Sequence, residues 1–227
     1  MADVKLGVMG KHPGYGDFLQ SGVSEHVVEA MNGWLDASLP PLRDQIGEDW
    51  GPFWDAGQDL RFWIGRAVLG RSVAGILHPS QDRVGRRYPL LFLVEGADIS
   101  LPLGEESEQG AWDAMADQLE RMEAGQGAAA LLTGAKLEIP AEDAATAGLG
   151  PTLWAHHPTG DLAALLASAA APDAERARLT RSYWWAPGVK TKDSNRAATW
   201  LSCPGLPAPQ ALAWLLGGVS GEGEEET

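Results

Sequence analysis

The side chains in this sequence that could do chemistry are few, and their spacing decides what kind of chemistry is open to them. The five histidines lie at positions 12, 26, 78, 156 and 157, and the single cysteine is Cys203. These spacings match no common pattern of metal ligands, so the sequence predicts no metal site. Ser80 lies between His78 and Asp82, but the Gly-x-Ser-x-Gly elbow of a hydrolase nucleophile is missing. A hydrolase that uses Ser80 therefore stays an open alternative that no motif supports.

A basic loop between two apolar runs offers a different chemistry, the binding of anions. Residues 73–77 and 89–94 are short runs rich in Val, Ile, Leu and Phe, which favours strands over helices. The residues between them concentrate charge: Asp82, Arg83, Arg86 and Arg87. Arginine forks bind phosphate groups or acidic surfaces, but they also lock a loop onto its own domain through a nearby carboxylate such as Asp82. We favour the locking role, because ion pairs inside domains are commoner than anion sites, and keep an anion- or nucleotide-responsive switch as the alternative.

A glycine-rich turn lies near the start of the chain, at residues 10–18, directly after an apolar run at residues 4–9. Gly10, Gly14 and Gly16 permit backbone conformations that other residues avoid, and Asp17 can accept hydrogen bonds from backbone N–H groups in the turn. The turn is not a phosphate-binding loop of the Walker type, because Lys11 follows the first glycine and no Ser or Thr follows it. The sequence therefore gives little support to nucleotide binding here.

The elements that must position these two loops follow from the hydrophobic pattern. Residues 60–64 read as a strand that pairs with residues 73–77, which predicts a meander of three antiparallel strands with residues 89–94. Because the inner runs are apolar without alternation, both faces of the sheet must be covered by helices. Residues 24–38 have helical spacing of apolar side chains, with Ser24 as the N-cap. We expect Pro40-Pro41 to end this helix and a short new one to begin after them.

The second half of the chain predicts further helices and strands. Helices are expected at residues 112–123, at residues 162–170 with Pro172 closing the helix, and at residues 207–216. Strands are expected at residues 181–187 and 197–203. Trp184 and Trp185 are adjacent in the first of these strands and so point to opposite faces, and both can be buried only if both faces are covered. The fold class is therefore α+β, an α/β sandwich with an antiparallel sheet of about five strands.

The composition limits the kinds of partner. The formal net charge is −14, from 17 basic and 31 acidic residues, which argues against nucleic acid and anionic membranes as partners. A single cysteine fits a reducing compartment, and no apolar run approaches the roughly 20 residues of a membrane-spanning helix. We expect a cytoplasmic protein with one domain at residues 1–217 and a disordered acidic tail at residues 218–227.

Two motifs carry a resemblance to a known family. They are Gly10-Lys-x-Pro-Gly-x-Gly-Asp-Phe18 and Pro79-Ser-x-Asp-Arg-Val-Gly-Arg-x-Tyr-Pro-Leu90, followed later by Ser182-x-Trp-Trp185. Together they resemble the TagF (ImpM) family of type VI secretion accessory proteins, most clearly at residues 7–94 and 182–201. The resemblance implies a longin- or SNARE-like fold and a regulator rather than an enzyme. It also implies post-translational repression of secretion through a forkhead-associated scaffold protein, in a pathway with a Ser/Thr kinase and a phosphatase.

The resemblance carries over positions rather than catalytic roles, cofactors or metals. We call residues 10–18 and 79–90 the first and second signature loops. The residues that match the family in these loops are Gly14, Gly16, Asp17, Ser80, Asp82, Arg83, Gly85 and Arg86, and Trp184 and Trp185 form a separate aromatic motif. These residues are the candidates for partner binding. We also expect Asp17 to pair with Arg83 or Arg86, which would join the two loops into one rigid surface.

Overall fold

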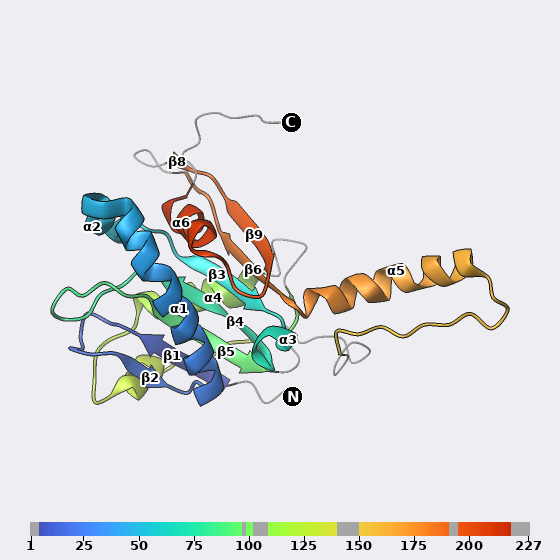
Figure 1. Cartoon of the computed structure of the whole chain (residues 1–227). Coiled ribbons are helices and arrows are strands. Elements are labelled where there is room, and N and C mark those ends of the chain that lie inside the picture. The colour runs from blue at the N-terminus through green and yellow to red at the C-terminus, as the bar shows by residue number, and fades with distance from the viewer. Residues whose placement is uncertain (1–4, 97–98, 102–108, 140–149, 191–194, 219–227) are drawn as a thin grey trace.

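A seven-stranded antiparallel sheet forms the centre of the computed structural model, which describes residues 5–96, 99–101, 109–139, 150–190 and 195–218. The strand order is β2-β1-β5-β4-β3-β6-β9 (Figure 1). The strands are β1 (Lys5–Gly10), β2 (Leu19–Ser21), β3 (Leu60–Ile64), β4 (Ser72–His78), β5 (Leu90–Gly96), β6 (Arg181–Ala186) and β9 (Thr199–Pro204). A separate short hairpin pairs β7 (Val189–Lys190) with β8 (Asn195–Arg196).

The meander expected from the sequence is confirmed. β3 pairs with β4 and β4 pairs with β5, all antiparallel, with Phe62 opposite Gly75 and Ile76 opposite Phe92. The expected number of about five strands is too low. β2 has only three residues, which is too short to give a periodic pattern in the sequence.

Helices cover both faces of the sheet, as the unbroken apolar strands required. The helices are α1 (Glu25–Ile46), η1 (Gly47–Asp49), α2 (Trp50–Asp55), α3 (Arg66–Leu69), α4 (Gly110–Glu120), η3 (Ala128–Leu132), α5 (Leu162–Arg178) and α6 (Pro209–Gly217). α1 and α6 bury their apolar side chains against one face, and α4 and η3 cover the other (Figure 1). Two apolar cores result, one on each side of the sheet.

The expectation that Pro40-Pro41 would end the first helix is wrong, because α1 runs through both prolines to Ile46. Both prolines lie on the exposed side of the helix, where water can bond the carbonyl groups that lose their N–H partners. Leu39 and Leu42 on either side of the pair are buried, so the apolar face of the helix continues across it. Burial of this face outweighs the local cost of the prolines.

α5 also continues past a proline, since it runs from Leu162 through Pro172 to Arg178 rather than ending near Ala170. Asp161 caps its first turn by accepting a hydrogen bond from the N–H of Ala164 at 3.0 Å. The helix projects from the body as an arm, with the chain before it running alongside (Figure 1). Because α5 buries no residue, water can reach the backbone around the proline.

The adjacent tryptophans of β6 point to opposite faces, as expected. Trp184 is fully buried and its ring stacks on Phe62, with 4.9 Å between ring centroids. Trp185 is half-buried on the α4 side and donates a hydrogen bond to Gln109 at 2.8 Å.

Two expectations concern the termini and the membrane. Most of the expected acidic tail, at residues 219–227, lies outside the described residues. No helix in the described part of the chain is long and apolar enough to cross a lipid bilayer.

Replacing Trp184 and replacing Trp200 should lower the free energy of unfolding by different amounts, because one side chain is buried and the other is exposed. Trp184→Ala leaves a cavity in the closed core and should lower the free energy of unfolding by about 3–5 kcal/mol. Trp200 on β9 is 53% exposed, so Trp200→Ala should cost less than about 1 kcal/mol. Urea unfolding followed by circular dichroism checks both. Equal losses would contradict the burial of Trp184.

Candidate partner-binding site

The two signature loops lie side by side at one end of the sheet. β1 pairs with β5 so that Gly10 is opposite Leu90, which places the start of the first loop beside the end of the second. Gly10 has φ of +118°, and a Cβ atom there would lie 2.0 Å from the carbonyl oxygen of Pro89. Only glycine fits this close approach without moving the backbone. The N–H of Lys11 then donates to the same carbonyl at 3.2 Å.

Asp82 is the centre of the second loop. Its Oδ1 accepts hydrogen bonds from the backbone N–H groups of Val84 at 3.1 Å and Arg86 at 2.9 Å. Its Oδ2 accepts from Nε of Arg86 at 2.6 Å and lies 3.1 Å from Nζ of Lys11 in the first loop. Gly85 completes the turn with φ of +84°. We call this arrangement the Asp82 cage. It confirms the expected role of Asp82 as a local partner for one loop arginine, Arg86.

The cage changes the acid–base behaviour of its carboxylate. Burial alone would raise the pKa of Asp82. The hydrogen bonds from the N–H and side chain of Arg86, from Lys11 and from the N–H of Val84 outweigh burial and hold that pKa well below its usual range. Asp82 is therefore ionised throughout the physiological pH range. Both of its carboxylate oxygens are bonded by groups of the protein itself.

Two further hydrogen bonds join the loops. The N–H of Arg83 donates to the carbonyl oxygen of Tyr15 at 2.8 Å, and Nη2 of Arg86 donates to the carbonyl oxygen of Gly16 at 2.7 Å. The expected ion pair of Asp17 is not formed. Asp17 is exposed and accepts a hydrogen bond from the N–H of Phe18 at 2.8 Å. The loops do form one surface, but backbone carbonyls of the first loop supply the acceptors.

The first loop is also bonded to the segment between α4 and η3, on the face of the sheet that these two helices cover. The hydroxyl of Tyr15 accepts from the N–H of Gly125 and donates to the carbonyl oxygen of Gly127, both at 2.9 Å. Gly14 lies so close to this segment that a Cβ atom would be 2.2 Å from Cβ of Ala124. A side chain at position 14 would therefore clash with this segment, which explains the need for glycine there.

Two residues near the end of the second loop attach it to α1 and α2. Arg87 donates two hydrogen bonds to the carboxylate of Asp55, at 2.9 and 2.7 Å. The hydroxyl of Tyr88 lies 3.3 Å from Oδ1 of Asn32 and 3.5 Å from that of Asp36, and burial together with Asp36 raises its pKa. Sequence reasoning missed these contacts, because nothing in the spacing links residue 55 to position 87 or residues 32 and 36 to position 88.

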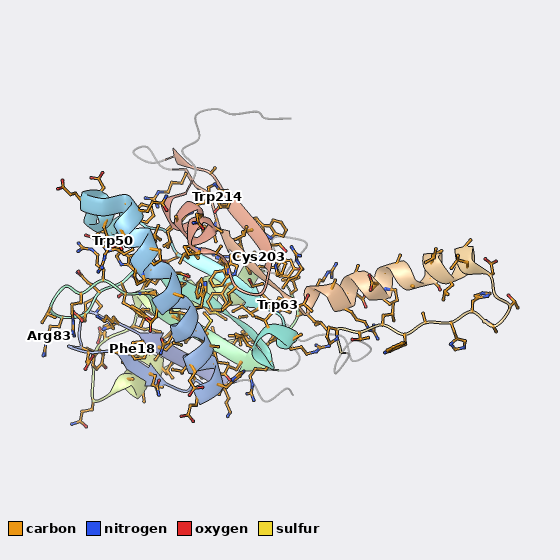
Figure 2. The ribbon with its side chains drawn as sticks, in the orientation of Figure 1. Phe18, Trp50, Trp63, Arg83, Cys203 and Trp214 are labelled. Carbon is orange, nitrogen blue, oxygen red and sulfur yellow. The ribbon has the colours of Figure 1, made fainter. Side chains whose placement is uncertain are left out.

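The outer tip of the second loop is the part left free. Val84 is 68% exposed, and the side chain of Arg83 has no hydrogen bond or ion pair among the described residues. Figure 2 shows Arg83 at the outer end of the loop, away from the sheet. The backbone of both residues is nevertheless fixed by Tyr15 and Asp82. We call Arg83 and Val84 the loop tip.

A groove of about 550 Å³ lies beside the second loop, against the C-terminal half of α1. Apolar atoms of Leu39, Pro40 and Trp50 line one side, and Arg86 and Tyr88 line the other. The groove was not predicted from the sequence, since it requires α1 to continue past the prolines that were expected to end it.

The serine of the second loop is not arranged as a nucleophile. Ser80 is buried, and its carbonyl oxygen accepts a hydrogen bond from Nε1 of Trp54 at 2.8 Å. Nδ1 of His78 lies 2.6 Å from Asp59, and no hydrogen bond joins His78 to Ser80. In the described part of the chain, no three His, Cys, Asp or Glu residues are grouped to hold a metal ion. Trp184 and Trp185 make no hydrogen bond or ring contact with either loop.

A comparison with family models shows the class of protein to which the paired loops belong, one associated with type VI secretion. The family model described as TagF N-terminal domain, type VI secretion system-associated, matches residues 7–134. This is more than half of the chain and contains both signature loops, so the chain belongs to the TagF family.

One solved structure extends the comparison to nearly the whole chain. The chain is similar to PA0076 from Pseudomonas aeruginosa PAO1, known from a crystal structure, with 26% sequence identity and a TM-score of 0.69. The alignment covers 98% of this chain and 97% of that one. A search of curated proteins gave no match.

The Asp82 cage predicts a pH-dependent stability. Asp82→Asn removes the charge that Lys11 and Arg86 face, and it should lower the Tm by on the order of 10 °C at neutral pH. Because the folded-state pKa lies below the ordinary 3.8, the ionised side chain stabilises the fold fully at higher pH. This stabilisation declines as the pH falls below about 3.8. The Tm difference between wild type and variant should therefore be constant from pH 7 to about pH 5 and should be clearly smaller at pH 3.

Asp17→Asn is the matched control for this experiment, since it removes a loop carboxylate that is exposed and forms no ion pair with any residue the structure describes. It should melt within about 2 °C of wild type at every pH. Thermal melts of the three proteins between pH 3 and pH 7 give the comparison. A Tm difference for Asp82→Asn that stays constant with pH would contradict the lowered pKa.

Proposed function

We propose that this chain is a cytoplasmic accessory protein that represses type VI secretion after translation, by binding a forkhead-associated scaffold protein. Family membership supports the link to type VI secretion. The proposal places the protein in a pathway with a Ser/Thr kinase and a phosphatase, as a binding protein rather than an enzyme. A longin-like adaptor fold belongs to the same proposal, and a covered antiparallel sheet is consistent with it.

The observation that carries this proposal is the loop tip. Arg83 and Val84 combine a free guanidinium with an exposed apolar side chain on a backbone held in place by the Asp82 cage. A fixed backbone lowers the entropy lost on binding, so such a loop can bind a partner with few contacts. The tip alone is too small for a stable interface, which takes about 800 Å² from each partner. The neighbouring groove supplies additional apolar surface for the same partner.

The geometry gives less support to an anion- or nucleotide-responsive switch. Arg86 already bonds Asp82 and Gly16, and Arg87 already bonds Asp55 in a bidentate pair. An anion bound by all three arginines of the loop would have to displace two internal carboxylates. The guanidinium that remains available is that of Arg83, and a single exposed arginine is a weak anion site.

Binding to the scaffold protein tests the proposal directly. Purified wild-type protein should bind the purified forkhead-associated scaffold protein in calorimetry, and Arg83→Ala combined with Val84→Ser should weaken that affinity at least about tenfold. The Tm should stay within about 2 °C of wild type, because neither side chain forms a hydrogen bond or ion pair within the described part of the chain.

Arg178→Ala is the control, since Arg178 is an exposed arginine on α5, away from both loops. It should bind the scaffold protein as wild type does. Unchanged binding by the loop-tip variant would move recognition away from the loop, and no binding by wild type would overturn the proposed function. A titration with inorganic phosphate should give no heat, and a heat signal lost in Arg83→Ala would favour the switch instead.

A further inference from the structure

The groove beside the second loop has a charge opposite to that of the whole chain. We call it the α1 groove. Three of its lining residues are arginines, Arg43, Arg86 and Arg87, and one, Asp36, is a carboxylate. In the whole chain, acidic residues outnumber basic ones by 31 to 17. The α1 groove is therefore a local cationic site in an acidic protein, and its charge favours a partner that carries carboxylates.

The arginines of the α1 groove keep donors for such a partner. Arg43 is exposed, and the ion pair that it makes among the described residues is a long contact of 3.8 Å from Nε to Asp44. Arg86 and Arg87 make their hydrogen bonds through Nε and Nη2, so Nη1 of each bonds no described residue. The carboxylates that pair with these two arginines do not line the groove. Each arginine can therefore bond a further carboxylate without losing a bond that it already makes.

The aromatic walls of the α1 groove are held in place by other rings. Trp50 packs against Phe53 and Trp54, with 6.1 and 5.1 Å between ring centroids. Tyr88, on the other side, packs against Phe18 at 5.9 Å. The volume of about 550 Å³ lies within the range of roughly 300–1,000 Å³ that is usual for ligand sites. Because its walls are already formed, the groove can take a large apolar side chain with little loss of entropy.

The surface continues beyond Trp50. A second, more open hollow shares Arg43, Trp50 and Arg87 with the α1 groove and adds Asp44 and Glu48. Positive and negative side chains balance in this second hollow, so the cationic excess belongs to the α1 groove. A surface that extends over two hollows suits a segment of polypeptide better than a small molecule.

We propose that the α1 groove binds a short segment of the partner protein in which acidic residues flank a large apolar residue. The apolar side chain enters between Trp50 and Tyr88. Carboxylates on either side of it bond Arg43 and the Nη1 groups of Arg86 and Arg87. This inference rests on the proposed function, because the segment is assigned to the partner that contacts the loop tip. The segment supplies the apolar burial that a tip of two side chains cannot provide.

Segments of this chain itself are poorer occupants of the groove. The acidic stretch at residues 222–226 consists of Glu and Gly, so it offers no apolar side chain. In a second copy, any acidic segment belongs to a chain of net charge −14, and two such chains repel each other. The charges therefore favour a different protein as the occupant.

A synthetic peptide tests the proposal on the whole protein. The probe is acetyl-Ser-Glu-Asp-Phe-Asp-Glu-Ser-amide, which has the proposed pattern. Titrated into the ¹⁵N-labelled protein at low salt, it should shift the indole N–H signal of Trp50 and saturate below roughly 1 mM. The indole signal of Trp200, on the edge strand β9, should not move. Arg43→Glu should weaken the affinity at least about tenfold and stay folded, because Arg43 is exposed. Arg178→Glu, on α5, is the matched control and should bind as wild type does.

Two altered peptides separate the apolar contribution from the charged one. Serine in place of phenylalanine removes the side chain that enters the groove. Asparagine and glutamine in place of aspartate and glutamate remove the carboxylates and keep the size of the side chains. Each altered peptide should bind at least about fivefold more weakly than the parent peptide, whose own affinity should fall as salt is added. The proposal is wrong if peptide at roughly 1 mM causes no shift. It is also wrong if Arg43→Glu or either altered peptide leaves the affinity unchanged.

The binding experiment with the scaffold protein keeps this test separate from the proposed function. Scaffold binding without peptide binding would overturn the specificity of the groove and leave the proposed function standing. Peptide binding without scaffold binding would overturn the proposed function and support the groove as a site for another acidic protein. Sedimentation of the protein alone should show a monomer. A dimer that Arg43→Glu dissociates would overturn the proposal in favour of a second copy.

Discussion

One buried carboxylate holds the candidate site together. The side chain of Asp82 has no exposed surface, and such a charge is tolerated only where hydrogen bonds and opposite charges replace the lost water. In the second loop, backbone N–H groups and Arg86 supply these hydrogen bonds and the opposite charge. Lys11 of the first loop supplies a second opposite charge. The requirement to satisfy this charge therefore determines where both loops lie. The backbone of the loop tip is fixed because Val84 donates its N–H to Asp82 and Arg83 donates its N–H to Tyr15.

The same interaction explains why the charge of the loop is a poor guide to its binding chemistry. Three arginines within five positions suggest a basic patch, but Arg86 and Arg87 are committed to internal carboxylates. One free guanidinium beside an exposed Val84 remains. Such a pair of side chains suits a protein surface better than a phosphate group, since phosphate recognition usually gathers several cationic donors.

The sequence predicted those features of the fold that depend on local pattern. Short apolar runs identified β3, β4 and β5, and the adjacency of Trp184 and Trp185 required helices on both faces. Asp82 and Arg86 are four residues apart, so their pairing was visible as well. The pairing of Asp17 was wrong, because an exposed carboxylate has no need of a partner and backbone carbonyls of the first loop took its place. The path of α1 through Pro40 was also missed, since burial of a helix face outweighs a local cost only once the tertiary packing exists.

Contacts between distant segments explain the rest of what was missed. Arg87 bonds Asp55, Tyr15 bonds Gly125, and Trp185 bonds Gln109. No spacing in one sequence links such positions. They also make the two edges of the sheet unlike: the loop with the exposed Arg83 stands at the end of β1, and the opposite edge is the uncharged strand β9.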